Sequence, residues 1–510
     1  MRRSVIQFKE RVITLNTGDN LTGFHTDYIT VMLLGTLLLN GKPVTAEGIA
    51  IAVVSDGTHK VVSALSGVFC IFIYYNNTIV MGRSMHSGPQ LFYRIDGTVV
   101  YISDKISDLA KSQGFSCTLN LSIAKNYLNG CSENGNETFI NGINKINNGE
   151  FLEFDRQLSS TLLIDEFYIA KSTHSVIDDI IYNVSIAHER RDITLLFSGG
   201  VDSALIFHAL KESGYNFSAC HYVSDYSNDS EKNFARAYCL KYGVPFTEVK
   251  KDHDFNEERY DELNPDVPDE IPLALESQYD MELGFEINNN DMFLLCGHGG
   301  DHIFGQNPSI LFGLDAFRDH GLRFMHKKMV EYASLKGKKY HDILIANMSA
   351  LKQEPAQYSL AKDEHISTMR LAASQFFSLD MNNKVKTFTP FLHKNIVQHY
   401  TKLPVFELFN NNYDRYPIRL DAFRRFSSDI FWKKTKRSSS QLIFRILSEK
   451  QSVITNMIEQ SGLCEALNIN QNEMKDDLYE NTTIRLTLRL PYLINFYRLS
   501  KFMQLHKVST

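Results

Sequence analysis

The feature that most constrains the fold of this chain is a strand pattern that stops on two glycines. Residues 193–204 read ITLLFSGGVDSA, an apolar run that leads through Ser198, Gly199 and Gly200 into a helical pattern. A strand that turns within a few residues into a helix is typical of a parallel sheet with helices on its faces. Such sheets bind ligands at the carboxyl ends of their strands. The sequence therefore predicts a binding site at residues 198–203.

The chain changes character near residue 170. From residue 192, four apolar strand patterns alternate with helical patterns that stop at Gly214 and Gly243; the strand patterns are DITLLF, SACHYVS, PFTEVK and DMFLLCG. Before residue 165 the chain contains short β-like runs separated by turn residues, namely GIAIAVV, GVFCIFIYY, NTIVMG, TVVYIS and GEFLEF. We expect an α+β domain at 1–168 with a mostly antiparallel sheet, and an α/β domain at 169–510 with a parallel sheet and a helical tail.

The glycine turn after the first strand pattern has the chemistry of an anion site. A helix start offers unpaired backbone N–H groups, glycines let an anion come close, and the hydroxyls of Ser198 and Ser203 can donate hydrogen bonds. The carboxylate of Asp202 would repel an anion unless a cation lies between them, which indicates Mg²⁺ bound to phosphate oxygens. The plain alternative is a tight turn with Asp202 offsetting the helix dipole.

A second glycine-rich loop follows a later strand. LLCGHGGDHIFG at 294–305 places Gly297 at the strand end and two further glycines before Asp301. If both strands belong to one sheet, Asp301 can complete the magnesium site with Asp202. The alternative is a glycine-rich turn that carries a surface acid.

Composition excludes several classes of protein. The net charge of −6 and the pI near 6.3 give no basic face for nucleic acid, and the runs HKK, RRF and KKTKR are too local to change this. Seven scattered cysteines without a CxxC pair fit a reducing cytoplasm. The apolar run YITVMLLGTLLLNG is shorter than the ~20 residues of a membrane span, and no signal peptide is expected at the N-terminus.

These motifs together resemble the asparagine synthetase superfamily over nearly the full chain. SGGVDSA resembles the family's pyrophosphatase loop, GHGGD its second motif, and TPFLHKNIV at 389 its PFL segment. LSGVFCIFIYY, GRSMHSGPQLFY and YISDKISDLA are similar to successive strands and turns of its glutaminase domain. The resemblance implies an ATP pyrophosphatase domain of the adenine-nucleotide α-hydrolase-like (HUP) type, which cleaves ATP to AMP and pyrophosphate.

One departure bears on the nitrogen source. The family's glutaminases use a cysteine directly after the initiator methionine, and this sequence has Arg2 there, with Cys70 as its first cysteine. Without a thiol the N-terminal domain is expected to be an inactive glutaminase-like domain. The attacking amine would then belong to the substrate itself.

The finer resemblance is to the lasso-peptide cyclases, on the stretches LLFSGGVDSALIFHALKESG, LLCGHGGDHIFGQNPS and FWKKTKRSSSQLIFRILS. It implies an ATP- and Mg²⁺-dependent macrolactam synthetase in the maturation of microcin-type antibacterial peptides. Such an enzyme adenylates an Asp or Glu side chain of a precursor peptide. The peptide's N-terminal amine, exposed by a leader-cleaving maturation protease, then attacks the adenylate.

Position by position, the resemblance implies site residues. The ATP- and pyrophosphate-binding residues would be Phe197, Ser198, Gly199, Gly200, Asp202, Ser203, Val223, Cys296 and Gly297, and the metal ligands Asp202 and Asp301. His298 stands where β-lactam synthetases have a tyrosine that works as a general base, and its alternative role is to shape the pocket wall. Lys436 is the first choice for a catalytic lysine near the oxyanion and Lys434 the second.

Three other readings stay open on the sequence alone. An ammonia-dependent amide synthetase would act on a small molecule and ignore peptides. A β-lactam-forming enzyme is disfavoured by His298. A non-catalytic binding protein is disfavoured by the intact set of Ser198, Asp202, Ser203 and Asp301.

Overall fold

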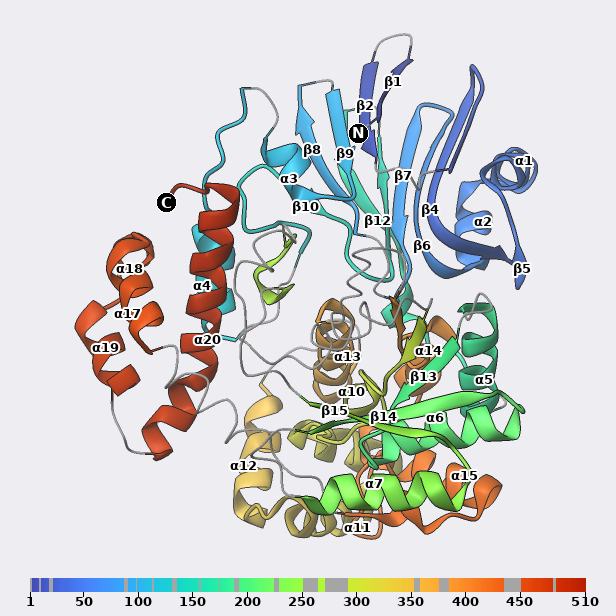
Figure 1. The fold of residues 1–510 in the computed structure, drawn as a ribbon, viewed down its shortest axis with the longest axis vertical. Helices are drawn as coiled ribbons and strands as arrows, with labels where there is room; N and C mark the ends of the chain where they lie inside the picture. Colours follow the sequence, from blue (N-terminus) through green and yellow to red (C-terminus); the bar gives the residue numbers. More distant parts are fainter. Residues whose placement is uncertain are drawn as a thin grey trace.

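The computed structural model places two β-sheets, a mixed α/β body and a group of C-terminal helices against one another (Figure 1). It describes residues 2–8, 11–17, 22–86, 90–97, 99–111, 114–130, 135–155, 157–173, 175–187, 192–223, 229–250, 265–270, 292–352, 358–375, 385–434, 451–479 and 483–510. Within these residues no helix is both long and apolar enough to cross a membrane.

The N-terminal part is built from two mostly antiparallel sheets. The first has the order β1-β2-β9-β8-β10, with only the β2–β9 pair parallel, and the second has the order β12-β11-β7-β6-β4-β3, with β5 paired to β4. Their bounds are β1 Arg2–Phe8, β2 Arg11–Thr17, β3 Thr22–His25, β4 Ile29–Leu39, β5 Lys42–Pro43, β6 Leu65–Tyr75, β7 Thr78–Arg83, β8 Phe92–Asp96, β9 Val99–Ser103, β10 Asn144–Lys145, β11 Glu150–Phe154 and β12 Ser160–Asp165.

Strand β6 explains why its sequence is apolar at nearly every position. Alternate residues of a strand face opposite sides of the sheet. Phe69, Ile71 and Ile73 face the core under helices α1 (Ala46–Asp56) and α2 (Thr58–Ala64), whereas Cys70 and Phe72 face the core between the two sheets. The turn at Asn76-Asn77, with φ of 52° and 62°, joins β6 to β7 as the sequence predicts.

One predicted strand is wrong. The run GIAIAVV lies inside helix α1 and not in a sheet. The N-cap Thr45 accepts a hydrogen bond from the backbone N–H of Gly48, which starts the helix despite the β-branched composition. The buried residues recur at helical spacing: Ala46, Ile49, Ala50 and Val53. The helix buries one face and exposes the other, on which Ile51 is 64% exposed. The N-cap and this amphipathic pattern outweigh the strand propensity of the β-branched residues.

The predicted parallel sheet is present, and its order puts the first glycine turn at its centre. The five strands follow the order β15-β14-β13-β16-β17, and all neighbouring pairs are parallel. Their bounds are β13 Asp192–Leu196, β14 Phe217–Val223, β15 Phe246–Lys250, β16 Met292–Leu295 and β17 Val385–Phe388. These strands correspond to the four predicted patterns and a further strand before the PFL segment.

Helices bury one face of this sheet in a large core. Helix α6 packs on β13, α5 and α15 pack on α6, and α13 packs on α10 and α14. The helices here are α5 Val176–Ala187, α6 Val201–Glu212, α7 Asp229–Lys241, α10 Gly300–Ile303, α11 Gly313–Lys336, α12 Tyr340–Ala350, α13 Leu360–Ser374, α14 Lys394–Lys402 and α15 Tyr416–Phe426, with short 3₁₀ turns η1 Glu166–Tyr168, η2 Pro268–Glu270, η3 Ile310–Phe312, η4 Val405–Glu407 and η5 Asp429–Trp432. The predicted helical C-terminal part is confirmed.

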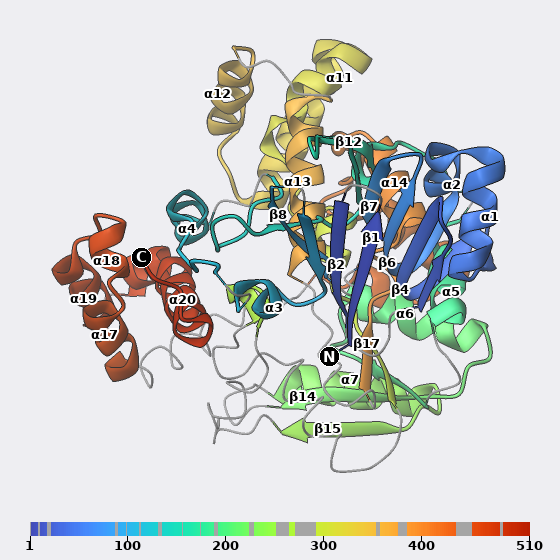
Figure 2. The same cartoon turned by 90° about the horizontal axis from the view of Figure 1, so that it is seen from above.

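The last helices return to the N-terminal part of the chain. Helix α20 packs against α4, and both views show the C-terminal helices beside α4 (Figures 1 and 2). Thr118 and Ser509 form a β-bridge next to this contact. The bounds are α3 Ile106–Ala110, α4 Leu121–Leu128, α17 Gln451–Gln460, α18 Leu463–Ala466, α19 Gln471–Tyr479 and α20 Thr483–His506. Residues between 92 and 143 of the N-terminal part therefore share one apolar core with the C-terminal helices.

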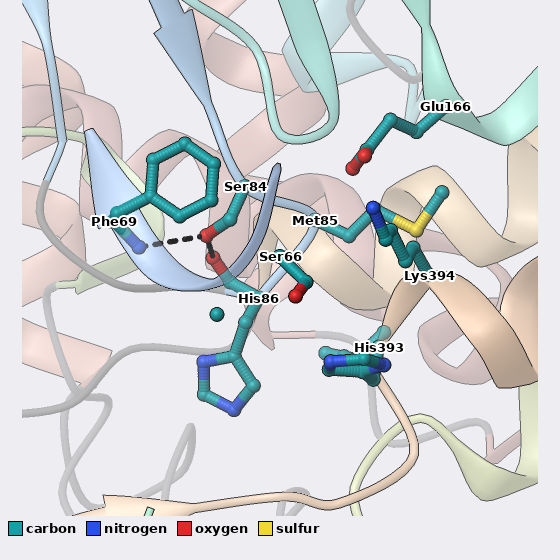
Figure 3. A pocket seen from close by; sticks show the side chains of 10 residues that line it. Ser66, Phe69, Ser84, Met85, His86, Glu166, His393 and Lys394 are labelled. Carbon is teal, nitrogen blue, oxygen red and sulfur yellow. Dashed lines mark hydrogen bonds between the residues drawn. The ribbon is translucent and has the colours of Figure 1, made fainter. Parts of the chain in front are cut away.

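A small polar cavity marks the seam between the β-sheets and the α/β body (Figure 3). Its volume of about 10 Å³ suits a single water. Glu166 lines it and is 6% exposed. Burial raises the pKa of Glu166 to about 7, although the nearby Lys394 opposes the rise. Lys394 itself donates to the carbonyl of Leu65 across the seam.

This seam predicts a pH-dependent stability. The native pKa of Glu166 near 7 lies above the ordinary 4.5, so the stability conferred by the protonated carboxyl is lost as pH rises through 7. Replacing Glu166 by Gln should raise the free energy of unfolding at pH 8 by up to about 3 kcal/mol and change little at pH 5. Urea unfolding at both pH values measures this. The exposed control Glu47→Gln should change neither value, and equal effects of Glu166→Gln at both pH values would contradict the assignment.

Candidate functional site

The first glycine turn leaves the central strand of the parallel sheet. Strand β13 ends at Leu196, and helix α6 begins at Val201. Gly199 has φ of +73°, which favours glycine, and a Cβ there would lie 2.8 Å from the ring of Phe234. The turn between strand and helix is thus compact, because the missing side chain at Gly199 lets its backbone pack directly against Phe234.

The two predicted serines face each other across this turn. The hydroxyls of Ser198 and Ser203 lie 3.2 Å apart, and Ser198 Oγ accepts from the backbone N–H of Gly200 at 3.3 Å. Ser203 Oγ donates to the carbonyl of Gly200 at 3.1 Å. Two hydroxyls and the first N–H groups of α6 therefore gather at one point, as an oxyanion site requires.

The second loop lies beside the first because β16 is the direct neighbour of β13. Gly299 has φ of +82° and caps the short helix α10. A Cβ on Gly300 would lie 2.7 Å from Asp202 Cγ, and one on Gly297 would lie 3.1 Å from Asp202 Cβ. Glycine is required at both positions so that the second loop can pack directly on the carboxylate of the first.

The two predicted metal ligands converge on one nitrogen. Arg415 Nη1 donates to Asp202 Oδ2 at 2.8 Å and to Asp301 Oδ1 at 2.6 Å. The Arg415 side chain is only 6% exposed. Burial acts to lower its pKa, but Asp202, Asp414 and Asp301 outweigh burial and raise the pKa of Arg415 above its usual value. A fixed cation therefore occupies the position between the two carboxylates.

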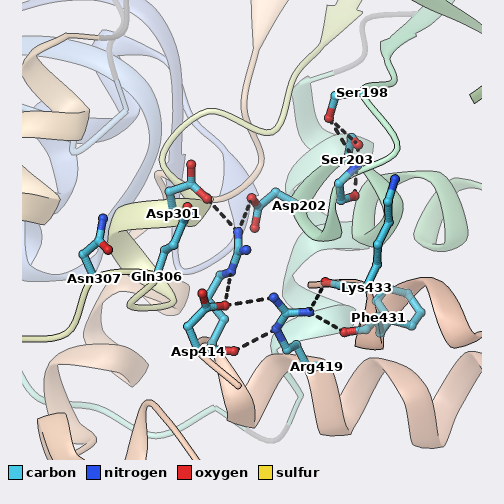
Figure 4. A network of polar contacts seen from close by, with 12 residues as sticks. Ser198, Asp202, Ser203, Asp301, Gln306, Asn307, Asp414, Arg419, Phe431 and Lys433 are labelled. Atoms are coloured by element: carbon cyan, nitrogen blue, oxygen red, sulfur yellow. Dashed lines mark hydrogen bonds and ion pairs between the residues drawn. The ribbon is translucent and has the colours of Figure 1, made fainter. Parts of the chain in front are cut away.

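Arg415 belongs to a longer polar network (Figure 4). Its Nε donates to Asp414 Oδ1 at 3.1 Å, and Arg419 Nη2 donates to the same oxygen at 2.8 Å. Arg419 Nη1 also donates to the carbonyl of Phe431 at 2.6 Å and to that of Lys433 at 3.2 Å. The network thus connects the acidic pair to the start of the basic segment KKTKR.

Within that segment, Lys433 is the lysine that reaches the first glycine turn. Its ammonium donates to the carbonyl of Gly199 at 3.4 Å and lies 3.9 Å above the ring of Phe234. Lys434 instead lies over the ring of Tyr413, at 4.4 Å from its centroid. Lys436, the first choice from the sequence, falls outside the described residues.

The predicted nucleoside-contacting residues surround the same strand ends. Phe197 and Cys296 each follow a strand directly, and Val223 ends β14. Phe197 is 1% exposed and its ring packs on Phe207, so the ring belongs to the core and not to a ligand surface. The carbonyl oxygen of Phe197 accepts a hydrogen bond from His221 Nδ1 at 2.8 Å. Gly297 is committed to the packing on Asp202 described above.

His298 is held in a defined tautomer. Its Nε2 lies 2.8 Å from the carbonyl oxygen of Ala372 on α13. Because a carbonyl only accepts hydrogen bonds, Nε2 carries the proton and Nδ1 is the basic nitrogen of the neutral ring. Burial lowers the pKa of His298 below 6.5, with a small opposing effect from the Ala372 carbonyl. The ring is therefore neutral, and so able to accept a proton, at physiological pH.

The carboxylates of Asp202 and Asp301 have the chemistry to bind a magnesium ion whose other ligands are substrate phosphates. Mg²⁺ typically uses one or two protein carboxylates and takes its other ligands from phosphate and water. Among the described residues, no group of three His, Cys, Asp or Glu side chains could hold a metal without such help. The donor set of Asp202 and Asp301 therefore suits a metal that arrives with a nucleotide.

Sequence reasoning missed four charged residues of this site: Lys433, Asp414, Arg415 and Arg419. Arg415 is the N-cap of α15, and Arg419 lies four residues further on, in the first turn of the helix. That spacing was the available signal, but it is common on solvated helices and does not by itself indicate a site.

The site thus brings serine hydroxyls, helix N–H groups and paired acids together at adjacent strand ends. The chain belongs to the asparagine synthase family, whose pattern matches residues 186–480, more than half of the chain, and it is therefore an ATP-dependent ligase that forms amide bonds. It is similar to the Microcin J25-processing protein McjC of Escherichia coli, with 54% identity over 504 residues that cover 99% of this chain and 98% of that protein.

Solved structures show only distant similarity. The glutamine phosphoribosylpyrophosphate amidotransferase of B. subtilis, in complex with ADP and GMP, is 10% identical with a TM-score of 0.18, and the match covers 60% of this chain and 61% of that one. An allosteric regulatory enzyme of purine biosynthesis is 9% identical with a TM-score of 0.18, over 45% and 62% of the two chains. Similarity at this level supports no conclusion on site or function.

The shared cation gives a prediction on the ligand-free protein. Replacing Arg415 by Met leaves the buried carboxylate of Asp202 and the partly exposed carboxylate of Asp301 without their common partner, and should lower the free energy of unfolding by about 3 kcal/mol. Added Mg²⁺ should then stabilise the variant more than the wild type, because it replaces the missing charge. Thermal unfolding with and without Mg²⁺ measures both effects.

The matched control for this prediction is Arg425→Met. Arg425 pairs with Glu212 and Asp178 and is 28% exposed, so its loss should cost about 1 kcal/mol or less and give no added response to Mg²⁺. Equal destabilisation of the two variants, with equal responses to Mg²⁺, would show that Arg415 does not hold the acidic pair together.

Proposed function

We propose that this protein is a lasso-peptide macrolactam synthetase that acts in the maturation of a microcin-type antibacterial peptide. It adenylates an Asp or Glu side chain of the precursor's core peptide and directs the peptide's N-terminal amine onto that carbonyl. The observation that carries the proposal is the convergence of Asp202 and Asp301 beside the paired hydroxyls of Ser198 and Ser203. The full-length similarity to the microcin J25-processing protein supports the peptide substrate.

The reaction needs ATP because a carboxylate does not react with an amine at neutral pH. In the first step a carboxylate oxygen attacks the α-phosphorus of ATP, the bond to pyrophosphate breaks, and an acyl-adenylate forms. In the second step the amine attacks the acyl carbon, loses a proton, and expels AMP with that same oxygen. The product is an amide, and one molecule of water has been removed from the peptide.

The residues of the first turn suit the departing pyrophosphate. Ser198, Ser203 and the backbone of Gly199 and Gly200 would donate hydrogen bonds to its oxygens. Asp202 and Asp301 would hold Mg²⁺, which supplies positive charge to the phosphate oxygens. Phe197, Val223, Cys296 and Gly297 would border the nucleoside through backbone and small side chains.

The basic segment supplies charge on the opposite side of the same turn. Lys433 already contacts the carbonyl of Gly199, and burial lowers its pKa while Glu231 acts to raise it. A fixed ammonium near the turn would stabilise both the phosphate and the tetrahedral oxyanion. We therefore include Lys433 with Lys434 and Lys436 as candidates for the catalytic lysine.

The N-terminal domain, residues 1–168, is proposed to be a glutaminase-like domain that has lost its activity. Burial raises the pKa of the Cys70 thiol to about 12, so it is protonated and inert at neutral pH. Cys117 also has a raised pKa from burial. Neither of these two thiols, the cysteines that the structure describes in this domain, is suited to be the nucleophile that releases ammonia from glutamine, which favours the peptide's own amine as the nitrogen source.

The partners follow from this chemistry. The N-terminal amine becomes available only after a leader-cleaving maturation protease has acted, so we propose that this protein works with such a protease. The cysteines are scattered along the sequence and form no CxxC pair, in keeping with a reducing compartment, and we propose a cytoplasmic location.

The direct test mixes the protein with ATP, Mg²⁺, the microcin J25 precursor and its leader protease, and follows the peptide by mass spectrometry and AMP by a coupled assay. The wild type should yield a peptide lighter by one water with one AMP per ring. Asp202→Asn and Asp301→Asn should each abolish AMP formation, because an amide keeps the shape and loses the charge that binds the metal. A small-molecule synthetase would instead release AMP without dehydrating the peptide.

A second prediction concerns His298 as general base. The neutral ring is the active form, and its lowered pKa means that the rate stays high below pH 6.5 and falls only at more acidic pH. His298→Gln should lower kcat by about 100-fold and remove this acidic limb. The exposed control His341→Gln should keep the wild-type profile. A wild-type kcat in His298→Gln would assign the residue to the pocket wall.

A further inference from the structure

A cavity of about 510 Å³ lies where the N-terminal sheets, helix α13 and helix α20 meet. This volume falls within the range of pockets that bind ligands. Residues of all three parts line it, among them Lys145 of β10, Arg370 of α13 and Arg498 of α20. None of the residues assigned above to ATP or Mg²⁺ contributes to its wall. The cavity is therefore separate from the residues proposed to bind ATP and Mg²⁺.

Helix α13 is the partition between the two sites. Its cavity face is a continuous stripe at helical spacing, made of Ser367, Arg370, Leu371, Ser374 and Gln375. Its other face holds the second glycine loop: the carbonyl of Ala372 binds His298 at 2.8 Å, and His365 binds the carbonyl of Ile303 at 3.1 Å. A group that reacts at His298 is thus one helix away from the cavity.

The wall on the N-terminal side is polar and held in place by its own hydrogen bonds. Glu150 accepts from Arg370 at 3.0 Å and from Asn147 at 3.0 Å, while Asp269 accepts from Tyr127 at 2.9 Å. Because these side chains are already held by hydrogen bonds, little conformational entropy is lost when a ligand binds to this wall.

Cations exceed acids on this wall. The described lining residues include the cations Arg83, Lys145, Arg370 and Arg498 but only the acids Glu150 and Asp269, and a third acid, Asp165, pairs with Arg370 from behind. Burial lowers the pKa of Lys145 to about 8, and the neighbouring Arg83 adds to this effect. Together with the ring of Phe139, this wall suits a ligand that carries carbonyl oxygens and apolar side chains.

We infer that this cavity holds the part of the peptide substrate that lies beyond the ring-forming acid, so that its loop and tail are kept folded while the ring closes. The inference rests on the proposed function, because it takes the substrate to be a peptide. In a lasso peptide the tail of the chain passes through the ring. The ring can therefore close around the tail only if the tail is already in place, and a chamber near the reacting groups provides that restraint. The same chamber gives the N-terminal domain a role that needs no glutaminase activity.

The test fills the cavity with a large side chain. Ser367 and Ser374 are exposed to it, so an indole at either position projects into space that the peptide needs. Ser374→Trp and Ser367→Trp should each raise the KM for linear microcin J25 core peptide about tenfold or more and leave the KM for ATP unchanged. Ser374→Ala, which removes only the hydroxyl, should behave as the wild type. Ser349→Trp on α12, an exposed serine away from the cavity, is the matched control.

Binding is measured in parallel by fluorescence anisotropy of a labelled core peptide without ATP, and melting temperatures establish that each variant is folded. Weaker binding and raised KM in the two cavity variants alone support the inference. Wild-type KM and binding in both folded cavity variants would overturn it while leaving the proposed function intact. Failure of the wild type to dehydrate the peptide would instead overturn the proposed function. If a variant does not fold, a benzophenone-bearing peptide is cross-linked to the wild type instead. Attachment to the cavity wall supports the inference, and attachment elsewhere contradicts it.

Discussion

The site depends on two like charges being held side by side. Asp202, which is buried, and Asp301, which is partly exposed, come from different loops, and their repulsion would separate the loops unless a cation lies between them. Arg415 supplies that cation, and Gly297 and Gly300 allow the close backbone approach that puts the acids in reach of one nitrogen. The charge of the acidic pair is therefore balanced within the protein itself.

Helix α13 connects this site to the rest of the molecule. One face fixes the proton of His298 through the Ala372 carbonyl, and the other face forms a wall of the cavity under the N-terminal sheets. Arg370 on that face is anchored by Glu150 of β11, so the position of the helix depends on the N-terminal part of the chain. Two ion pairs of Arg370, with Glu150 and Asp165, thus join the two halves of the protein.

The sequence predicted the two loops and the sheet because glycine, acid and strand signals are local and coincide within a few residues. It did not predict Arg415, which acts on a loop more than a hundred residues away in the chain and carries no local pattern. It did single out the basic segment KKTKR, but it chose Lys436 and Lys434 in that segment and not Lys433, which contacts the Gly199 carbonyl. The run GIAIAVV was assigned to a strand because its β-branched composition hid the capping hydrogen bond at Thr45. The packing of α20 on α4 could not be foreseen either, because an amphipathic helix does not specify which surface will cover it.

We propose that a peptide side-chain carboxylate is adenylated at the first glycine turn. This can be measured with a core peptide in which both oxygens of the ring-forming carboxylate are ¹⁸O, by following the label in AMP by mass spectrometry during ring closure. Each AMP released should contain one ¹⁸O atom, because a carboxylate oxygen attacks the α-phosphorus and leaves with it. Unlabelled AMP accompanied by a closed ring would show instead that the carboxylate was activated by another route.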